Sequence, residues 1–305
     1  MTIPLSDGQE PLVVATFSRR MALQLANGEK VSARVKGRRL RPVCGDRVEA
    51  EPIANEPEWL ITRVLPRTNE LGRPNTRGKL EVLAANLSFI AVVTADPPTP
   101  DWFIVDRYLC AAELMGVSAA VIFNKTDLAE PGTGVRDTLQ DYERIGYQTV
   151  LCSARSGANL DALRVLLARQ TAIIVGQSGV GKSSLINRLA ENADLPTTAV
   201  SEGSGEGRHT TVNSVMLALP NGGAVIDSPG VREYAPGTDN VNDVIRGFRE
   251  IAKFGADCKF SDCRHLREPD CAVKAAIEAG QISARRYESY KRLLASTKKL
   301  TEKKY

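Results

Sequence analysis

The first 68 residues alternate apolar and polar positions in short runs, which is the pattern of β-strands whose two faces differ. Runs at 21–26 and 31–35 flank Asn27-Gly28, a pair that accepts the positive φ of a two-residue hairpin turn. Further runs lie at Leu12–Phe17, Asp46–Glu51 and Trp59–Val64. We expect residues 1–68 to form an all-β barrel of the oligonucleotide-binding type, which serves either RNA binding or packing alone.

Residues 69–238 contain longer apolar runs that alternate with helical patterns, after a basic stretch rich in Gly and Pro at 66–80 that predicts a linker. Helical patterns lie at Ile104–Met115 and Ser183–Ala190, among others. Buried strands that alternate with helices predict a mostly parallel, doubly wound α/β sheet. The strand candidates are Phe89–Thr94, Ala119–Phe123, Thr149–Cys152, Ala172–Val175, Val215–Leu219 and Ala224–Ile226.

Residues 239–305 predict a third, helical domain with a basic tail. Its last segment has one apolar stripe at helical spacing, formed by Tyr287, Tyr290, Leu293 and Leu294. Residues 30–47 hold seven Lys or Arg against Asp46, and residues 285–305 hold eight against two Glu, although the formal net charge is only +4. The two basic ends indicate a polyanionic partner that contacts both flanking domains. The alternative is that both basic surfaces are solvated and bind no partner.

The composition is that of a globular protein, with 43% hydrophobic and 25% charged residues. No apolar run reaches the roughly 18 residues that a membrane span needs, and residues 1–20 lack the pattern of a signal peptide. The chain also carries no lipidation motif, which argues against a membrane-acting protein. We therefore expect a cytoplasmic location and, by default, a monomer.

A phosphate-binding loop follows the apolar run 172–175 and matches the pattern G-x-x-x-x-G-K-[ST]. Its backbone N–H groups and the helix that follows suit phosphate binding, and Ser184 extends the loop into that helix. We expect Lys182 to neutralise the β- and γ-phosphates and Ser183 to ligate Mg²⁺. The loop consists of Gly176, Gln177, Ser178, Gly179, Val180, Gly181, Lys182 and Ser183.

The base is indicated by Asn124-Lys125-Thr126-Asp127, because Asp127 can accept two hydrogen bonds from guanine that adenine does not offer. This argues against an ATPase or a P-loop kinase. We expect Asn124 to tie neighbouring loops together and Lys125 to lay its methylenes along the base. Ser153-Ala154-Arg155 supplies a companion loop, whose Ala154 N–H we expect to face guanine O6.

The segments around 209–211 and 227–230 predict the Mg²⁺ and γ-phosphate loops. Thr211, or with less support Thr210, should reach Mg²⁺ together with Ser183 and Asp227, while the Gly230 N–H should contact the γ-phosphate. The position after this glycine is Val231 rather than a water-orienting Gln. We therefore hypothesise that His209 positions the attacking water, with a structural loop histidine as the alternative.

The order of these motifs is circularly permuted. An ordinary GTPase begins with the phosphate loop and ends with guanine recognition, whereas here the guanine loops at 124–127 and 153–155 come first. The permutation leaves Asp227 and Gly230 next to the C-terminal domain. Our hypothesis is that GTP holds the two basic flanks in an RNA-compatible arrangement, and that hydrolysis releases it.

Four residues with metal-ligand side chains fall within 14 positions of the C-terminal domain. Three thiolates and one imidazole form a closed tetrahedral set for a structural Zn²⁺, and a chance cluster of reduced thiols is the alternative. Cys44, Cys110 and Cys152 are isolated and are interpreted as core residues. The predicted zinc ligands are Cys258, Cys263, His265 and Cys271.

Together, the 176–184 loop, Gly207–Thr211, Asp227–Arg232 and the zinc spacing resemble the bacterial ribosome small subunit-dependent GTPase A family over almost the full chain. The resemblance implies a late-acting assembly factor that binds the 30S subunit and 16S rRNA. It also implies slow GTP hydrolysis, stimulated by the subunit and centred on His209. The alternative function is a zinc-containing RNA-binding protein that uses the guanine nucleotide as a switch with little turnover.

Overall fold

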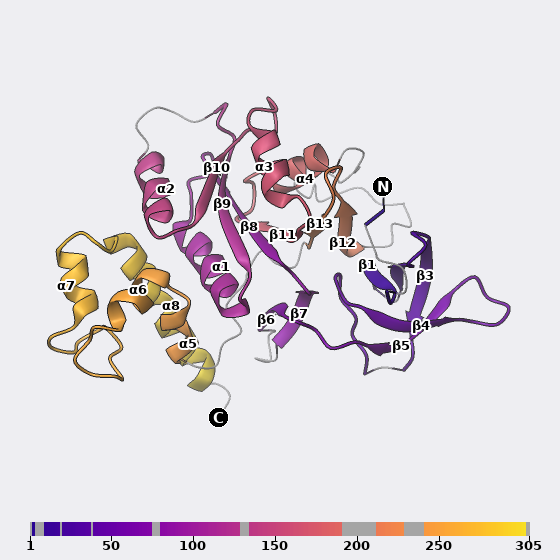
Figure 1. Cartoon of the computed structure of the whole chain (residues 1–305), viewed down its shortest axis with the longest axis horizontal. Helices are drawn as coiled ribbons and strands as arrows, with labels where there is room; N and C mark the ends of the chain where they lie inside the picture. Colours follow the sequence, from indigo (N-terminus) through magenta and orange to yellow (C-terminus); the bar gives the residue numbers. More distant parts are fainter. Residues whose placement is uncertain are drawn as a thin grey trace, which may run out of the picture.

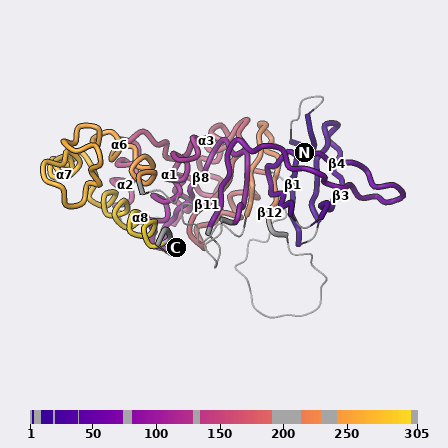
Figure 2. The backbone as a smooth tube through the Cα atoms, turned by 90° about the horizontal axis from the view of Figure 1, so that it is seen from below, coloured from indigo at the N-terminus to yellow at the C-terminus, as the bar shows by residue number. Residues whose placement is uncertain are grey.

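The computed structural model describes residues 2–3, 9–18, 20–37, 39–74, 80–128, 134–190, 212–228 and 241–302. The molecule is elongated and has three parts in a row (Figures 1 and 2). A β-barrel lies at one end, an α/β unit in the middle and a group of helices at the other end. The order in space follows the order in sequence, so the α/β unit contacts both flanks.

The barrel is built from five short strands, β1 to β5, hydrogen-bonded in the order β1-β2-β3-β5-β4. A bridge between Leu12 and Arg47, just before β4, returns the last strand to the first. Alternate residues point inward and form a core of Val13, Leu23, Ala33, Val48 and Ile61. The predicted barrel is therefore confirmed. The strands span Leu12–Phe17, Met21–Gln24, Lys30–Val35, Val48–Pro52 and Trp59–Val64.

The middle unit has five parallel strands in the order β10-β9-β8-β11-β13, with β12 antiparallel beside β13. Helices α1 (Trp102–Met115) and α2 (Val135–Arg144) cover one face of this sheet, whereas α3 (Leu160–Leu167) and α4 (Lys182–Leu189) cover the other. The doubly wound α/β prediction is confirmed. The strands are β8 (Phe89–Ala95), β9 (Ser118–Asn124), β10 (Gln148–Leu151), β11 (Thr171–Gly176), β12 (Val212–Ala218) and β13 (Ala224–Asp227).

The barrel and the middle unit share one eleven-stranded sheet, because β1 pairs antiparallel with β12. Pairing between strands this far apart in sequence leaves no local signal. The domain boundary expected at residue 68 therefore divides the chain but does not separate two sheets. The linker prediction for 66–80 missed β6 (Glu70–Pro74), which pairs with β7 (Leu80–Ala85) in a second, two-stranded sheet. Leu71 of β6 is fully buried, and Gly72 and Pro74 concealed this strand in the pattern.

The C-terminal helices are α5 (Val241–Arg246), α6 (Arg249–Gly255), α7 (Ala272–Glu278) and α8 (Ala284–Glu302). Their apolar core includes the predicted stripe of α8 and extends to Cys110 of α1. A Cβ added at Gly247 would overlap the Cys110 sulfur, so glycine permits this close approach. None of the described helices has the length and apolar character that crossing a bilayer requires.

A buried ionic network joins the C-terminal helices to the middle unit. Arg286 of α8, 1% exposed, donates Nε and Nη2 to the carboxylate of Glu250 at 2.7 and 2.9 Å. Its Nη1 donates to Asp106 of α1 at 2.8 Å. Burial alone lowers the pKa of Arg286, but the charges of Asp106 and Glu250 outweigh burial and hold that pKa above its ordinary value. The network therefore fixes α1, α6 and α8 relative to one another.

Asp106 is a shared acceptor in this network, since it also receives hydrogen bonds from Arg285 Nη1 at 2.8 Å and from the Tyr142 hydroxyl at 2.5 Å. Two of the basic residues counted in the C-terminal tail thus serve an internal role. The counts of charge in the sequence overstated the positive charge that this end presents to a partner.

We expect Arg286→Ala to destabilise the contact of α6 and α8 with α1 by about 3–5 kcal/mol, because it leaves the buried Glu250 carboxylate without a partner among the described residues and removes one of the donors to Asp106. Hydrogen–deuterium exchange of the α6 and α8 amides measures this local opening. The matched control is Arg246→Ala, which removes an exposed pair with Asp243 at 3.5 Å and should cost about 1 kcal/mol or less. Equal exchange in the two variants would contradict the role given to the network.

Candidate functional site

Three of the predicted motifs lie at one edge of the parallel sheet. β9 ends at Asn124, β11 ends at Gly176 and β13 ends at Asp227. These strands run in the same direction, with β8 between β9 and β11, so their carboxyl ends meet at the edge where such sheets bind ligands. The order of the motifs in the chain does not affect this convergence.

The Asn124 side chain connects three loops at this edge. It is 1% exposed; its Nδ2 donates to Val180 O at 2.9 Å, and its Oδ1 accepts from the Ala154 N–H at 3.0 Å. A Cβ on Gly181, whose φ is +90°, would overlap Asn124 Nδ2, so glycine is required beside this amide. Asn124 therefore holds the phosphate loop and both predicted guanine loops together.

Lys125 and Asp127 reinforce these connections. Lys125 Nζ donates to Gly179 O at 2.7 Å and to Pro97 O at 3.0 Å, so its charge lies on the phosphate loop. The Ser153 hydroxyl donates to Asp127 Oδ1 at 2.5 Å and accepts from the Ser156 N–H at 3.0 Å. One oxygen of the exposed Asp127 carboxylate is thus oriented by the companion loop.

One expectation about this loop differs from the structure. The Ala154 N–H was assigned to guanine O6, but here it donates to Asn124 Oδ1. The sequence contains both groups without showing that they pair across the loops.

A cavity of about 460 Å³ lies between the guanine loops and α4. It is large enough for a small ligand and places Asp127 across from Gly181 and Ser184. Several lining residues could not be identified from the sequence, because Leu128 and the α4 residues Asn187 and Arg188 belong to no recognisable motif. The lining residues are Asn124, Lys125, Asp127, Leu128, Ala154, Arg155, Gly181, Ser184, Asn187 and Arg188.

The phosphate loop curves from β11 into α4. Lys182 Nζ donates to Gly176 O at 2.9 Å and to Gln177 O at 2.7 Å, so the ammonium lies against the start of its own loop. Ser178 and Gly179 are exposed at the bend, and Ser183 lies in the first turn of α4. Backbone N–H groups, a lysine and a helix N-terminus at one bend are suited to an anionic phosphate chain.

The predicted Mg²⁺ and γ-phosphate loops are described in part. Asp227 ends β13, and the next residue, Ser228, accepts a hydrogen bond at 2.9 Å from Ser214 of β12. This bond joins the two strands at the edge of the sheet that carries the phosphate loop. His209, Thr210, Thr211 and Gly230 lie outside the described residues.

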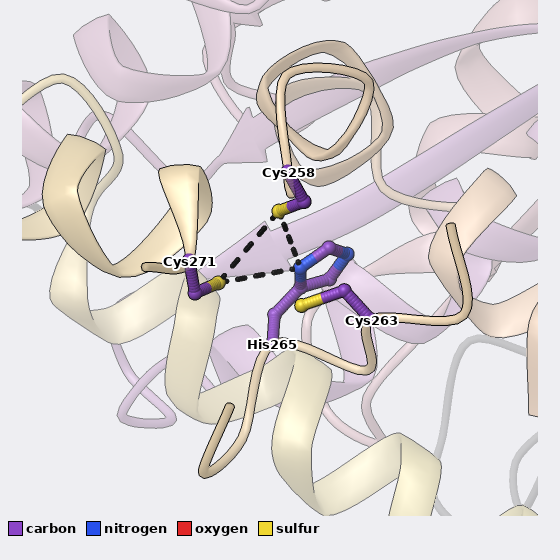
Figure 3. A group of neighbouring side chains, drawn as sticks. All are labelled: Cys258, Cys263, His265 and Cys271. Carbon is purple, nitrogen blue, oxygen red and sulfur yellow. Dashed lines mark hydrogen bonds between the residues drawn. The ribbon is translucent and has the colours of Figure 1, made fainter. Parts of the chain in front are cut away.

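A second cluster joins three cysteines and a histidine in the segment between α6 and α7 (Figure 3). Their ligand atoms all lie within 4.8 Å of one another. The measured separations are 3.9 Å between the Cys258 and Cys271 sulfurs and 3.5 Å from each of these to His265 Nδ1. A tetrahedron with Zn–S bonds of about 2.3 Å has edges of about 3.8 Å. Cys258, Cys263, His265 and Cys271 can therefore hold a zinc ion without large rearrangement.

Hydrogen bonds from surrounding residues stabilise the loop that carries His265. The Glu268 carboxylate accepts from the backbone N–H groups of Arg264, Leu266 and Arg267 at 2.8 to 3.1 Å. The Tyr287 hydroxyl of α8 donates to His265 O at 2.5 Å. Burial lowers the pKa of His265, which favours the neutral imidazole that a metal requires. No sequence motif includes Glu268, whose role depends on the turn itself.

Comparisons with known proteins agree with this geometry. A family model described as RsgA GTPase matches residues 64–236. The "Small ribosomal subunit biogenesis GTPase RsgA" of Haemophilus influenzae is 39% identical over 96% of this chain and 86% of its own length. The protein of the same name from Azotobacter vinelandii is 40% identical over 96% and 87%.

Two solved structures resemble the whole chain. YjeQ from Thermotoga maritima has a TM-score of 0.74 and 30% identity and covers 95% of this chain and 98% of its own. YloQ, described as a circularly permuted GTPase, has a TM-score of 0.71 at 23% identity and covers 96% of each chain. The second likeness concerns the fold alone, and its description as circularly permuted agrees with the order of the motifs in this chain.

We expect Glu268→Ala to weaken zinc binding by about 10- to 100-fold, because the hydrogen bonds of Glu268 orient the turn that carries His265. Transfer of zinc to a colorimetric chelator measures this affinity. The control is Asp262→Ala, which removes an exposed carboxylate from the same loop and should leave the transfer curve unchanged. If both variants retain zinc equally well, the hydrogen bonds of Glu268 do not support the metal site.

Proposed function

This chain belongs to the RsgA GTPase family, and we propose that it hydrolyses GTP on the small ribosomal subunit during late maturation of that subunit. The curated relatives carry small-subunit biogenesis in their names. The chain spans 86% and 87% of the length of these two relatives, so the barrel and the C-terminal helices are part of the comparison. The expected location is the cytoplasm, where ribosomal subunits are assembled.

The observation that carries this proposal is the Asn124 connection beside the 460 Å³ cavity. The buried Asn124 amide joins the phosphate loop to the loops 124–127 and 153–155, whose sequences are typical of guanine-binding loops. The cavity then has a carboxylate at one side and the start of α4 at the other. This is the arrangement that a guanine nucleotide requires, with its base at Asp127 and its phosphates over the loop 176–182.

We assign the roles at this site as follows. Asp127 accepts from guanine N1–H and its exocyclic amine, and the Arg155 N–H, next in the turn after Ala154, is the donor that we expect at guanine O6. Lys182 and the N–H groups of the phosphate loop neutralise the β- and γ-phosphates. Ser183 and Asp227 serve Mg²⁺, the latter through its water shell. The guanine site is thus selective because an adenine would offer Asp127 neither of these two base donors.

Hydrolysis depends on the segments that precede β12 and follow β13 in the chain. We infer that Thr211, with Thr210 beside it, ligates Mg²⁺ when GTP is bound, and that the Gly230 N–H contacts the γ-phosphate. His209 would hold and polarise the attacking water, since Val231 has no group that can do so. Mg²⁺ itself would offset the negative charge that develops on the phosphate oxygens.

The flanking parts are proposed to bind 16S rRNA. The barrel carries the basic hairpin around residues 30–41, and the C-terminal helices carry basic residues on α8. A Zn²⁺ held by the four ligands would stabilise the C-terminal part, which has a small core of its own. α5 follows β13 closely in the chain, so movement of the γ-phosphate loop on hydrolysis has a short path to these helices. We propose that this path releases the subunit, and equal affinity of the GDP and GTP-analogue forms for the subunit would refute it.

The test is phosphate release from GTP with and without purified small subunits. We expect slow release by the protein alone and a large stimulation by subunits. Lys182→Ala should abolish both rates by removing phosphate binding. His209→Ala should lower the stimulated rate by about 100-fold or more with GTP affinity unchanged.

Each outcome of this assay has one meaning. Hydrolysis without stimulation would contradict action on the small subunit. Binding to subunits with no phosphate release would instead favour the RNA-binding protein that uses GTP only as a switch. Full stimulated turnover by His209→Ala would leave the GTPase proposal intact and remove His209 from the reaction.

A further inference from the structure

A second cavity, of about 430 Å³, lies where the first turn of α1 meets α8. We call it the α1–α8 cleft. Residues 99–103 form one wall, and Arg285, Glu288, Ser289 and Arg292 of α8 form the other. Its volume is close to that of the guanine cavity, but it lies outside every motif recognised in the sequence.

Two arginines of α8 lie over aromatic rings of α1 in this cleft. The guanidinium carbon of Arg292 is 4.0 Å from the ring centroid of Phe103, and that of Arg285 is 5.7 Å from the ring centroid of Trp102. A guanidinium held on an aromatic face keeps N–H donors at its edge for a planar or anionic acceptor.

The hydrogen bonds of these arginines are incomplete. Arg285 gives Nη1 to Asp106, whereas its Nε and Nη2 donate to no group within the described residues. Arg292 is exposed and forms no ion pair with any carboxylate that the structure describes. Arg292 is therefore the more accessible donor, whereas the unpaired N–H groups of Arg285 are buried.

The acidic groups of the cleft are already engaged. Glu288 pairs with Lys291 at 2.7 Å, and the Asp101 carboxylate accepts from the N–H groups of Phe103 and Ile104 at 3.0 and 3.3 Å as the cap of α1. Arg285, Arg292 and Lys299 follow at seven-residue spacing and so share one face of α8. The cleft thus opens onto a row of positive charge.

We infer that the α1–α8 cleft binds one unpaired nucleotide of RNA, with its base against Trp102 and its phosphate at Arg292. Aromatic side chains beside arginine are the usual means of holding unstacked bases of single-stranded RNA. A cavity of this size admits one small ligand, so a base turned out of its helix fits, whereas a continuous duplex does not. The inference rests on the proposed function only in taking the small subunit as the source of this RNA.

The cleft also contacts the nucleotide site. The Asp101 N–H donates to Gln177 Oε1 of the phosphate loop at 3.1 Å. Asp101 thus caps the helix turn that carries Trp102 and Phe103, and it positions a side chain of the phosphate loop. RNA bound in the cleft stabilises this turn, so RNA and guanine nucleotide each affect the affinity of the other.

The first experiment measures RNA binding without ribosomes. Trp59→Phe leaves Trp102 as the one tryptophan of the chain, which has two. Titration of this protein with a single-stranded hexauridylate should quench Trp102 fluorescence. Adding Arg292→Ala should weaken binding by about tenfold, the value of one charge-assisted hydrogen bond.

Lys298→Ala is the matched control, because it removes one positive charge from the same helix at an exposed position outside the cleft lining. It should change the affinity by less than about twofold. Equal losses in the two variants would show that α8 attracts RNA only as a charged surface, and this overturns the inference. Equal quenching by an RNA duplex would also overturn it, because a paired base cannot enter the cleft.

The second experiment separates this inference from the proposed function. In the phosphate-release assay, Arg292→Ala should lower the ratio of rates with and without small subunits, and Lys298→Ala should not. If the wild-type protein shows no stimulation, the proposed function fails, while the oligonucleotide titration still decides the cleft. If the wild-type protein is stimulated and Arg292→Ala is stimulated equally, the cleft does not act on the subunit.

Discussion

The proposed nucleotide site depends on one buried amide. Asn124 donates to the phosphate loop through Nδ2 and accepts from the companion guanine loop through Oδ1, at 2.9 and 3.0 Å. Both groups of a buried amide are satisfied only when the three loops are in place, and an unpaired one costs about 1–3 kcal/mol. Asn124 therefore fixes the predicted guanine loops relative to the phosphate loop, and none of these loops fixes that arrangement alone.

The convergence of parallel strands explains why circular permutation is tolerated. Parallel strands bring their carboxyl ends to one edge whatever their order in the chain, so β9, β11 and β13 converge as they would in an unpermuted protein. What permutation changes is the neighbour that follows β13. Here α5 follows, and the helices beyond it are fixed to α1 by the buried pair of Arg286 with Asp106 and Glu250. The α1 helix thus meets the phosphate loop at one end and the C-terminal helices along its length.

Much of the fold and the composition of the site could be predicted from the sequence, because strand alternation, the phosphate-loop glycines and the Cys/His spacing are local. The rest depends on tertiary packing. The β1–β12 pairing, the burial of Arg286 and the position of Arg188 beside the guanine loops arise from contacts between distant segments. β6 was missed for a different reason, since Gly72 and Pro74 concealed a short strand. The assignments of His209, Thr210, Thr211 and Gly230 stay predictions, as do the domain boundaries at 68 and 238.

The most direct test of the single permuted cavity is the base preference of Asp127→Asn. Xanthine presents acceptors where guanine presents its exocyclic amine, so an amide at position 127 should exchange the preference. Competition binding with GTP and xanthosine triphosphate measures the ratio of the two affinities. We expect the wild-type protein to favour GTP by several orders of magnitude, about 10⁴ for a site with such a buried pair, and the variant to favour xanthosine triphosphate. An unchanged preference would show that Asp127 does not read the base, and that this cavity is not the guanine site.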